Sequence, residues 1–290
     1  MRHILICTPT YGDFPKPFVN ALCAYLTKDL GVKFDFIYTN ATYVEQARDE
    51  LAMAAINAGF DETFWIDLDM GHRDQGVILQ QTQRLLSHDV PIVCAQYTTH
   101  TIRSNFIGSS MPGATPDANG LLKMALAPIG FAKIKTEVFK KIREMTPECA
   151  YTQRNPTQEP KPLHQFFRNG LIGRNTAESK LARIRELLVP GKAYTFEDSA
   201  KTLTEIAGIV ADNDYSDQTW MGEDFDFCQR VRAAGYDILM DTRLVIPHGT
   251  YVGLPISNAD VYHMVQERWR NHDIGHLKTI IANLEFGEVK

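Results

Sequence analysis

Short apolar segments alternate with helical patterns over the first 95 residues, and this alternation restricts the possible folds more than any other feature. Runs of strand length and composition occur at residues 3–7, 33–38, 63–66 and 91–95. Segments with helical spacing of apolar residues separate them, at residues 17–29, 40–59 and 74–87. Strands separated by helices form a parallel sheet with helices on its faces. We therefore predict an α/β fold with a mostly parallel sheet and ligands at the carboxyl ends of its strands.

Two carboxylates, Asp67 and Asp69, directly follow the third of these strands. Because side chains two positions apart share a face of a strand, both can point at one hard cation if the strand geometry continues through the motif. A carboxylate at the end of a buried strand needs a metal, an arginine or backbone N–H groups to offset its charge. A helix cap or a turn is the more frequent role of an isolated D-x-D pattern. Two further polar loops, residues 8–12 and 40–45, are expected at the same edge of the sheet.

Composition and missing motifs exclude several classes of protein. With 44% hydrophobic and 22% charged residues among 290, the chain is globular, and a net charge of −5 argues against a protein that coats nucleic acid. Its five cysteines are scattered without a C-x-x-C pair, so neither a disulfide framework nor a zinc knuckle is indicated. No glycine-rich dinucleotide or P-loop motif is present. Because the first strand begins at residue 3 and no apolar run is long enough to span a membrane, we expect a cytoplasmic protein.

The middle of the chain gives a weaker pattern. Residues 98–127 are rich in glycine and proline, which predicts a long loop or a hairpin. Residues 129–134 form a strand pattern, followed by a helix with Thr136 as its N-cap. Residues 147–162 are predicted to be a proline-rich connection, and two helices are predicted at 177–188 and 197–210.

A basic stretch covers residues 161–192, with seven Lys or Arg against two Glu, a local balance of +5. A solvated helix face is the more frequent explanation of such a stretch. A surface for a polyanion such as DNA is the alternative.

A second set of acidic residues opens a helix at Gly222-Glu223-Asp224, and Gly235 ends it. Carboxylates in a first helical turn interact favourably with the helix dipole without any catalytic role. A general base held at a rigid helix start is the functional alternative. Two short strands, 236–240 and 244–246, then lead to His248, a lone histidine beside a glycine.

The ordered set of these motifs, from residue 2 to about 251, resembles metal-dependent glycosyltransferases of the GT-A fold, family 2-like, including short phage-encoded members. The resemblance implies a GT-A-like, Rossmann-type catalytic domain at 1–256 with a helical insertion at about 161–216, followed by a C-terminal helical extension at 257–290. The extension, with a helix at 257–283, is a candidate for homo-oligomer contacts.

The resemblance also implies roles for individual residues. Asp67 and Asp69 would bind Mn²⁺ or Mg²⁺ together with His248, and Asp67 would also contact the nucleotide ribose. Asp224 would act as the base that deprotonates the acceptor hydroxyl, and Glu223 would contact the acceptor. The remaining residues would surround the nucleotide of a nucleotide-sugar donor, a UDP-sugar by the resemblance, and comprise Thr8, Pro9, Thr10, Tyr11, Asn40 and Arg48.

The acceptor is expected to carry a hydroxyl group, and a hydroxymethylpyrimidine in DNA suits both the phage-encoded relatives and the basic stretch 161–192. The Gly222-Glu223-Asp224 motif resembles that of inverting members of the family, and this resemblance implies an inverting outcome. The sequence leaves two other functions open. One is a metal-dependent phosphohydrolase of the haloacid dehalogenase type, which also uses a D-x-D pair. The other is a non-catalytic nucleotide-sugar binder, which would not need Asp224.

Overall fold

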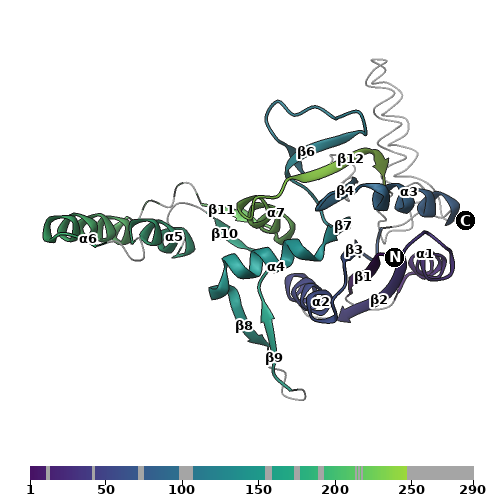
Figure 1. Ribbon diagram of the computed structural model, residues 1–290, viewed down its shortest axis with the longest axis horizontal. Helices are drawn as coiled ribbons and strands as arrows, with labels where there is room; N and C mark the ends of the chain where they lie inside the picture. The colour runs from purple at the N-terminus through teal and green to yellow at the C-terminus, as the bar shows by residue number, and fades with distance from the viewer. Residues whose placement is uncertain are drawn as a thin grey trace, which may run out of the picture.

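A computed structural model describes residues 1–10, 14–40, 43–70, 75–97, 107–153, 159–172, 177–188, 193–212, 214, 216 and 218–246. Three of the predictions lie outside these residues: the positions of Tyr11 and His248, and the C-terminal helix at 257–283. The described part contains an eight-stranded sheet, two small two-stranded sheets and seven α-helices (Figure 1).

The main sheet has the strand order β2-β1-β3-β7-β4-β12-β6-β5. Strands β2, β1, β3, β4 and β12 run in one direction, whereas β7 and β6 run in the other. The predicted α/β class with a mostly parallel sheet is therefore confirmed. The strands are β1 (His3–Thr10), β2 (Lys33–Asn40), β3 (Glu62–Ile66), β4 (Ile92–Gln96), β5 (Ser109–Ser110), β6 (Leu121–Leu126), β7 (Phe131–Lys135) and β12 (Ile238–Val245).

Helices cover both faces of this sheet, and alternating strand residues point to the two faces. On one face Trp65 packs in a core that includes residues of α2, α4 and α7. On the other, Phe64 and Ile66 pack in a core that includes residues of α1 and α3. The helices are α1 (Lys16–Thr27), α2 (Val44–Ala58), α3 (Gln75–Ser87), α4 (Thr136–Met145) and α7 (Glu223–Ala233). Gly59 ends α2 in the left-handed conformation, at φ 73°, as its position after a helical pattern predicts.

Strand β7 separates β3 from β4 and is antiparallel to both. The alternation of strands and helices in the sequence did not predict that an antiparallel strand lies between β3 and β4. It has a consequence for the site, because β7 begins just after Gly130, at the edge of the sheet where β3 and β4 end.

Three predictions about the middle and the end of the chain were wrong. The connection predicted at 147–162 contains the 3-10 helix η1 (Pro147–Cys149) and a hairpin of β8 (Ala150–Gln153) and β9 (Lys161–His164). Thr136 is the first residue of α4, after Lys135 as N-cap, and it makes no side-chain cap. The two strands predicted at 236–240 and 244–246 are the single strand β12.

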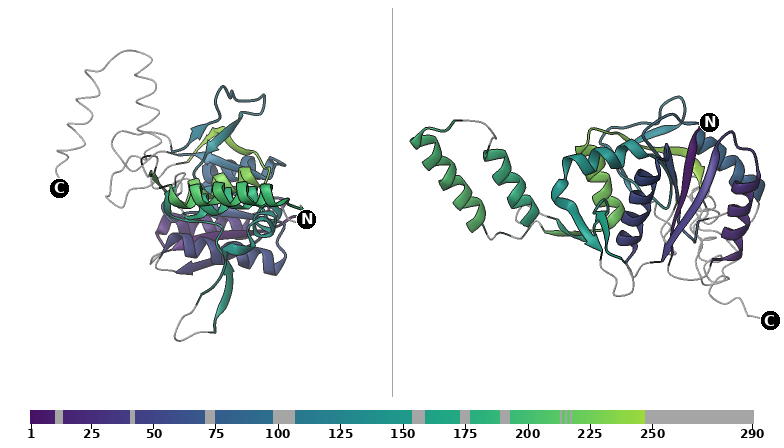
Figure 2. Two further views of the ribbon diagram at one scale, coloured as in Figure 1. Left: turned by 90° about the vertical axis from the view of Figure 1, so that its left-hand side faces the viewer. Right: turned by 60° about the horizontal axis from the view of Figure 1, so that its bottom comes forward.

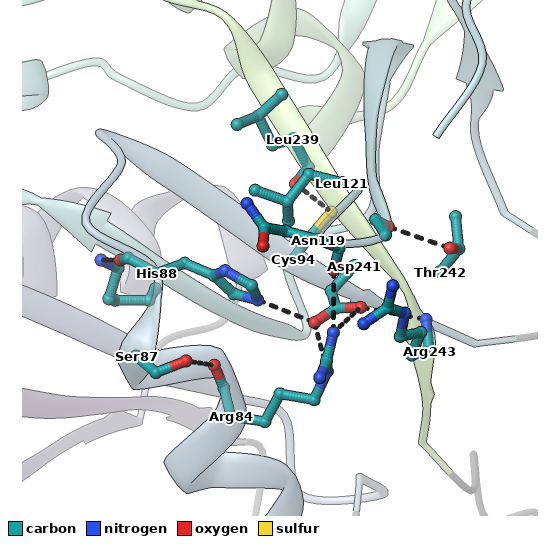
Figure 3. Close-up of polar contacts among 12 residues, drawn as sticks. Arg84, Ser87, His88, Cys94, Asn119, Leu121, Leu239, Asp241, Thr242 and Arg243 are labelled. Carbon is teal, nitrogen blue, oxygen red and sulfur yellow. Dashed lines mark hydrogen bonds and ion pairs between the residues drawn. The ribbon is translucent and has the colours of Figure 1, made fainter. Parts of the chain in front are cut away.

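Asp241 explains why β12 continues through a polar segment. Its side chain is fully buried, and its carboxylate lies 2.7 Å from both Arg84 Nε and His88 Nε2 (Figure 3). Both partners come from α3 and its C-terminal end. A buried carboxylate that has such partners does not interrupt a strand.

The helical insertion forms a hairpin of α5 (Ala177–Leu187) and α6 (Phe196–Ala211) at the two predicted positions. The hairpin extends away from the sheet and its covering helices (Figures 1 and 2). The antiparallel pair β10 (Gly170–Ile172) and β11 (Thr219–Met221) joins it to the rest of the chain. Strand β11 leads directly into Gly222, the N-cap of α7.

Candidate functional site

Asp67 lies at the carboxyl end of β3, immediately after Ile66. Its backbone N–H donates to the carbonyl of Gly130 at 2.9 Å, which fixes the start of the D-x-D segment against the start of β7. A Cβ atom on Gly130 would lie 2.6 Å from both Asp67 Oδ2 and the Tyr97 hydroxyl. Glycine is therefore required at position 130 for these two polar groups to approach each other.

Arg48, from α2, lies at the centre of the acidic residues. Its side chain is buried, and its Nη2 lies 3.1 Å from Asp67 Oδ2 and 3.5 Å from Asp224 Oδ1. Its Nε lies 3.9 Å from Glu223 Oε1. One guanidinium thus faces three carboxylates, so full ionisation leaves the cluster with an excess of negative charge. Such an excess favours binding of a cation.

Two aromatic rings hold the Arg48 guanidinium in place. Its central carbon lies 5.8 Å from the ring centre of Trp65 and 5.7 Å from that of Phe167, within the range of cation–π attraction. The Nε and Nη1 groups of Arg48 form no hydrogen bond to any described residue. Both atoms are buried, and the predicted contact of Arg48 with a phosphate stays a prediction.

Asp224 lies in the first turn of α7, the element that the sequence predicts for a general base. Its Oδ2 accepts a hydrogen bond of 2.9 Å from the backbone N–H of Ile129, whereas its Oδ1 accepts none from the described residues. Burial raises the pKa of Asp224 to about 7; the charge of Arg48 opposes this shift, and the carboxylates of Glu223 and Asp67 add to it. A carboxylate with a pKa near neutrality suits proton transfer.

Tyr97 is a residue of the site that sequence reasoning missed. It follows β4, is buried, and its hydroxyl accepts a hydrogen bond of 2.8 Å from the Gly130 N–H. Burial raises the pKa of Tyr97 well above its usual value, and the charges of Asp224 and Asp67 raise it further. The hydroxyl therefore stays protonated between two carboxylates. No sequence signal distinguished Tyr97 from a core aromatic residue at the end of an apolar strand.

Asp49, next to Arg48 in α2, was also missed, and it anchors the segment that carries Phe167. Its carboxylate accepts hydrogen bonds from the backbone N–H groups of Phe166 and Phe167 at 2.8 and 3.0 Å, and from the Tyr151 hydroxyl at 3.1 Å. Burial raises the pKa of Asp49 to about 7, although these hydrogen bonds lower it. Through this contact, the start of the insertion is attached directly beside the acidic cluster.

The residues predicted to receive the nucleotide lie at the same edge of the sheet. Strands β1 and β2 pair in parallel, so that Thr10 lies opposite Asn40 and Pro9 opposite Thr39. Strand β1 also pairs with β3 in a register that aligns Cys7 with Trp65, which places Pro9 level with Asp67. Thr8 and Thr10 are buried. The predicted convergence of the first two polar loops with the D-x-D segment is thus supported for their described residues.

Two of the three predicted metal ligands, Asp67 and Asp69, are described, and they lie beyond the end of β3 in a turn, where the Met70 N–H donates to the Asp67 carbonyl at 3.0 Å. No group of three or more His, Cys, Asp or Glu side chains gathers as a metal site within the described residues, and His248 lies outside them. Asp67 and Asp69 are both partly exposed at the edge of the sheet. Mg²⁺ characteristically binds through one or two carboxylates plus substrate phosphates and waters, so this donor set suits it.

Among the described residues of the basic stretch 161–192, three basic side chains make contacts within the chain. Arg168 forms an ion pair of 2.8 Å with Asp226, and Arg185 one of 2.7 Å with Glu148. Lys180 donates to the carbonyls of Val210 and Asp212 at the end of α6. Fewer positive charges are therefore available to bind a polyanion than the count of +5 indicates.

No helix among the described residues is long and apolar enough to cross a membrane. No protein-family model matches the chain, and no curated protein matches its sequence. Among solved structures, the chain is similar to A197 from STIV, at 13% identity and a TM-score of 0.43 over 86% of each chain. It is also similar to S. aureus TarS 1–349, at 14% identity and a TM-score of 0.30, over 80% of this chain and 72% of that one. At such TM-scores the likeness carries no functional argument.

Proposed function

We propose that this protein is a metal-dependent glycosyltransferase that moves a sugar from a nucleotide-sugar, a UDP-sugar, to an acceptor hydroxyl with inversion. The observation that carries the proposal is the position of Asp67 and Asp224. They lie 157 positions apart in the sequence, yet both are in contact with the same Nη2 atom of Arg48. One of them belongs to a D-x-D segment and the other has a pKa near 7.

The donor would lie along the edge formed by the ends of β1, β2 and β3. In this arrangement Asp67 and Asp69 hold a divalent ion, which would stabilise the charge of the departing diphosphate. Arg48 would pair with the same anion. Thr8, Pro9, Thr10 and Asn40 lie where the nucleoside would bind.

Asp224 would carry the proton transfer. Its Oδ1 takes the proton of the acceptor hydroxyl as the acceptor oxygen bonds to the anomeric carbon, and the bond from that carbon to the diphosphate oxygen breaks. The products are the glycosylated acceptor and a nucleoside diphosphate. Glu223, adjacent to Asp224 in the first turn of α7, would contact the acceptor.

The experiment is a nucleotide-release assay with UDP-sugars and Mn²⁺, on the wild-type chain and on Asp224→Asn. We expect metal-dependent UDP release in the wild type. Asp224→Asn should release UDP about 10²-fold to 10⁴-fold more slowly, the usual contribution of a general base. A variant that releases UDP at the wild-type rate would refute the role of Asp224. In that case the protein would be a nucleotide-sugar binder that hydrolyses its ligand only incidentally.

A phosphohydrolase of the haloacid dehalogenase type would use the first aspartate of the pair as a nucleophile. Asp67 faces the buried Arg48 guanidinium at 3.1 Å, and this charge reduces the nucleophilicity of the carboxylate. Hydrolysis of simple phosphate esters, with no UDP-sugar turnover, would support the hydrolase instead.

The acceptor predicted from the sequence, a hydroxymethylpyrimidine in DNA, stays a prediction. Duplex DNA that carries hydroxymethylpyrimidine should stimulate UDP release, and plain duplex of the same sequence should not. Equal rates with both duplexes and without DNA would exclude this acceptor.

A further inference from the structure

The hairpin of α5 and α6 has two apolar faces, although a helical hairpin needs only one to hold itself together. The first face is the contact between the two helices. On α6, residues Ser199, Thr202, Ile206 and Ile209 recur at spacings of three and four and are the half-buried or buried positions of the helix. On α5, Ile184 and Leu187 are likewise half-buried. This contact is a narrow seam of the coiled-coil type.

The second face is exposed. Phe196, Leu203 and Val210 recur every seven residues on α6, and Leu181 and Leu188 are seven apart at the end of α5. Seven residues are nearly two helical turns, so each set forms a stripe along its helix. Their exposed fractions are 53% for Leu181, 50% for Leu188, 92% for Phe196, 65% for Leu203 and 59% for Val210. We name these five residues the apolar hairpin face.

The two stripes lie on the same side of the hairpin. A helix turns by about 100° per residue, which places each stripe about 100° around its helix from the seam. The sense of this rotation is the same on both helices when each is viewed from its N-terminus to its C-terminus. The two helices run antiparallel (Figure 2), and equal rotations in antiparallel neighbours point to the same side. The stripes therefore combine into one surface.

The size of this surface matches half of a protein interface. Five large apolar side chains with these exposed fractions present on the order of 600 Å² of apolar area, at the upper limit of what monomeric proteins expose. Two such faces in contact would bury roughly 1,200 Å², the lower bound for a specific dimer. Ala200 and Ala207 lie between the large residues of α6 and allow a second helix to approach closely.

The charges around the face are consistent with a second copy and not with a membrane. A helix that lies on a membrane carries Lys and Arg on its polar face. In contrast, α6 carries Glu197, Asp198 and Glu205 against a single Lys201. The basic residues of α5 are Lys180, Arg183 and Arg185. Of these, Lys180 donates to carbonyls at the end of α6 and Arg185 pairs with Glu148. A face made of regularly spaced large and small residues can also pack against itself around a two-fold axis.

We propose that the chain forms a symmetric dimer in which the apolar hairpin faces of two copies pack into a four-helix bundle. This contact is separate from the acidic cluster, and it does not depend on the proposed enzymatic function. It is also distinct from the C-terminal extension, where the sequence predicts homo-oligomer contacts. The hairpin is joined to the rest of its chain through β10 and β11. The main sheets of the two copies would therefore lie either at opposite ends of the bundle or side by side.

The test is the mass of the full chain in solution, by light scattering and sedimentation over a range of micromolar concentrations. The variant is Leu203→Glu, at the centre of the α6 stripe. The matched control is Lys201→Glu, which places the same side chain on the exposed opposite side of α6. Circular dichroism checks that both variants keep the wild-type helix content.

We expect the wild type and Lys201→Glu to show twice the 32.8 kDa mass of one chain. Leu203→Glu should weaken the dimer by at least about tenfold in dissociation constant. A monomeric wild type would overturn the proposal, as would a dimer that Leu203→Glu leaves intact. Flotation with phosphatidylcholine and phosphatidylglycerol vesicles tests whether the face binds a membrane instead. A monomer that binds vesicles through Leu203 would assign the face to a membrane and also overturn the dimer.

Discussion

Arg48 Nη2 lies 3.1 Å from Asp67 Oδ2, although Arg48 belongs to α2 and Asp67 follows β3. The same nitrogen faces Asp224 at 3.5 Å. The guanidinium therefore joins the two halves of the candidate site, the D-x-D segment and the start of α7. Its own position depends on Trp65 and Phe167, two neighbouring rings of the core whose centres lie 5.5 Å apart and that both contact it.

Replacement of Arg48 by Met should destabilise the fold, because three carboxylates then lose their shared partner. Removal of one member of a buried ion pair costs about 3–5 kcal/mol. The lower end applies here, since the side chains of Asp67, Glu223 and Asp224 keep partial access to solvent. Urea denaturation measures the change. Arg185→Met, which breaks the exposed pair with Glu148, is the control and should cost less than about 1 kcal/mol. Equal costs for the two variants would contradict the central role of Arg48.

Replacement of Gly130 by Ala should damage the site, because the added Cβ would lie 2.6 Å from both Asp67 Oδ2 and the Tyr97 hydroxyl. We expect a loss of about 1–3 kcal/mol in the free energy of unfolding, typical of overpacking, and a weaker response to Mn²⁺ in thermal-shift measurements. Gly170→Ala is the control, since a Cβ there meets nothing within 4 Å. Unchanged metal binding in Gly130→Ala would show that Asp67 does not need its present position.

The pH dependence of turnover should follow Asp224. The base acts in its ionised form, and burial raises its pKa to about 7, so kcat/KM should fall as the pH is lowered through about 7. A pH profile of UDP release measures this. A profile that stays flat down to pH 5 would mean that another group accepts the proton.

The pH dependence of stability should follow Asp49. Its pKa is about 7 in the folded chain against 3.8 ordinarily, so the folded state binds a proton more strongly than the unfolded state does. The stability that this provides is fully present below about pH 4 and is lost as the pH rises through about 7. We therefore expect the free energy of unfolding, measured by urea denaturation, to change less between pH 5 and pH 8 in Asp49→Asn than in the wild type.

Asp89→Asn is the control for Asp49. The Asp89 carboxylate is exposed, and its hydrogen bond with Lys135 lowers its pKa, so it stays ionised across this range. Its variant should keep the wild-type difference between pH 5 and pH 8. An Asp49→Asn variant with the same difference as the wild type would contradict a raised pKa at Asp49.

The sequence predicts local features of this fold well and long-range pairings poorly. The helical spacing of apolar residues up to Gly59 predicted α2 and its end, because both depend on neighbouring residues. The antiparallel position of β7 between β3 and β4 depends on contacts across the sheet. Asp241 inside β12 was missed for a similar reason, since the two side chains that neutralise it come from α3 and its end, about 150 residues earlier.

The same distinction applies to the candidate site. The D-x-D segment and the acidic start of α7 are short motifs, so the sequence indicated Asp67, Glu223 and Asp224, which the fold brings together around Arg48. The role of Asp69 stays a prediction. The sequence also indicated Arg48, but its three acidic partners depend on how α2, β3 and α7 pack together. Tyr97 and Asp49 carry no motif, and only the fold shows that they face the acidic cluster and its supporting segment.

The most direct test of the central claim is the binding of a UDP-sugar measured by isothermal titration calorimetry, with and without Mn²⁺, on the wild type, Asp69→Ala and Asp224→Asn. The account predicts Mn²⁺-dependent binding in the wild type and in Asp224→Asn, and no binding in Asp69→Ala. Binding that is independent of Mn²⁺, or that survives unchanged in Asp69→Ala, would contradict it.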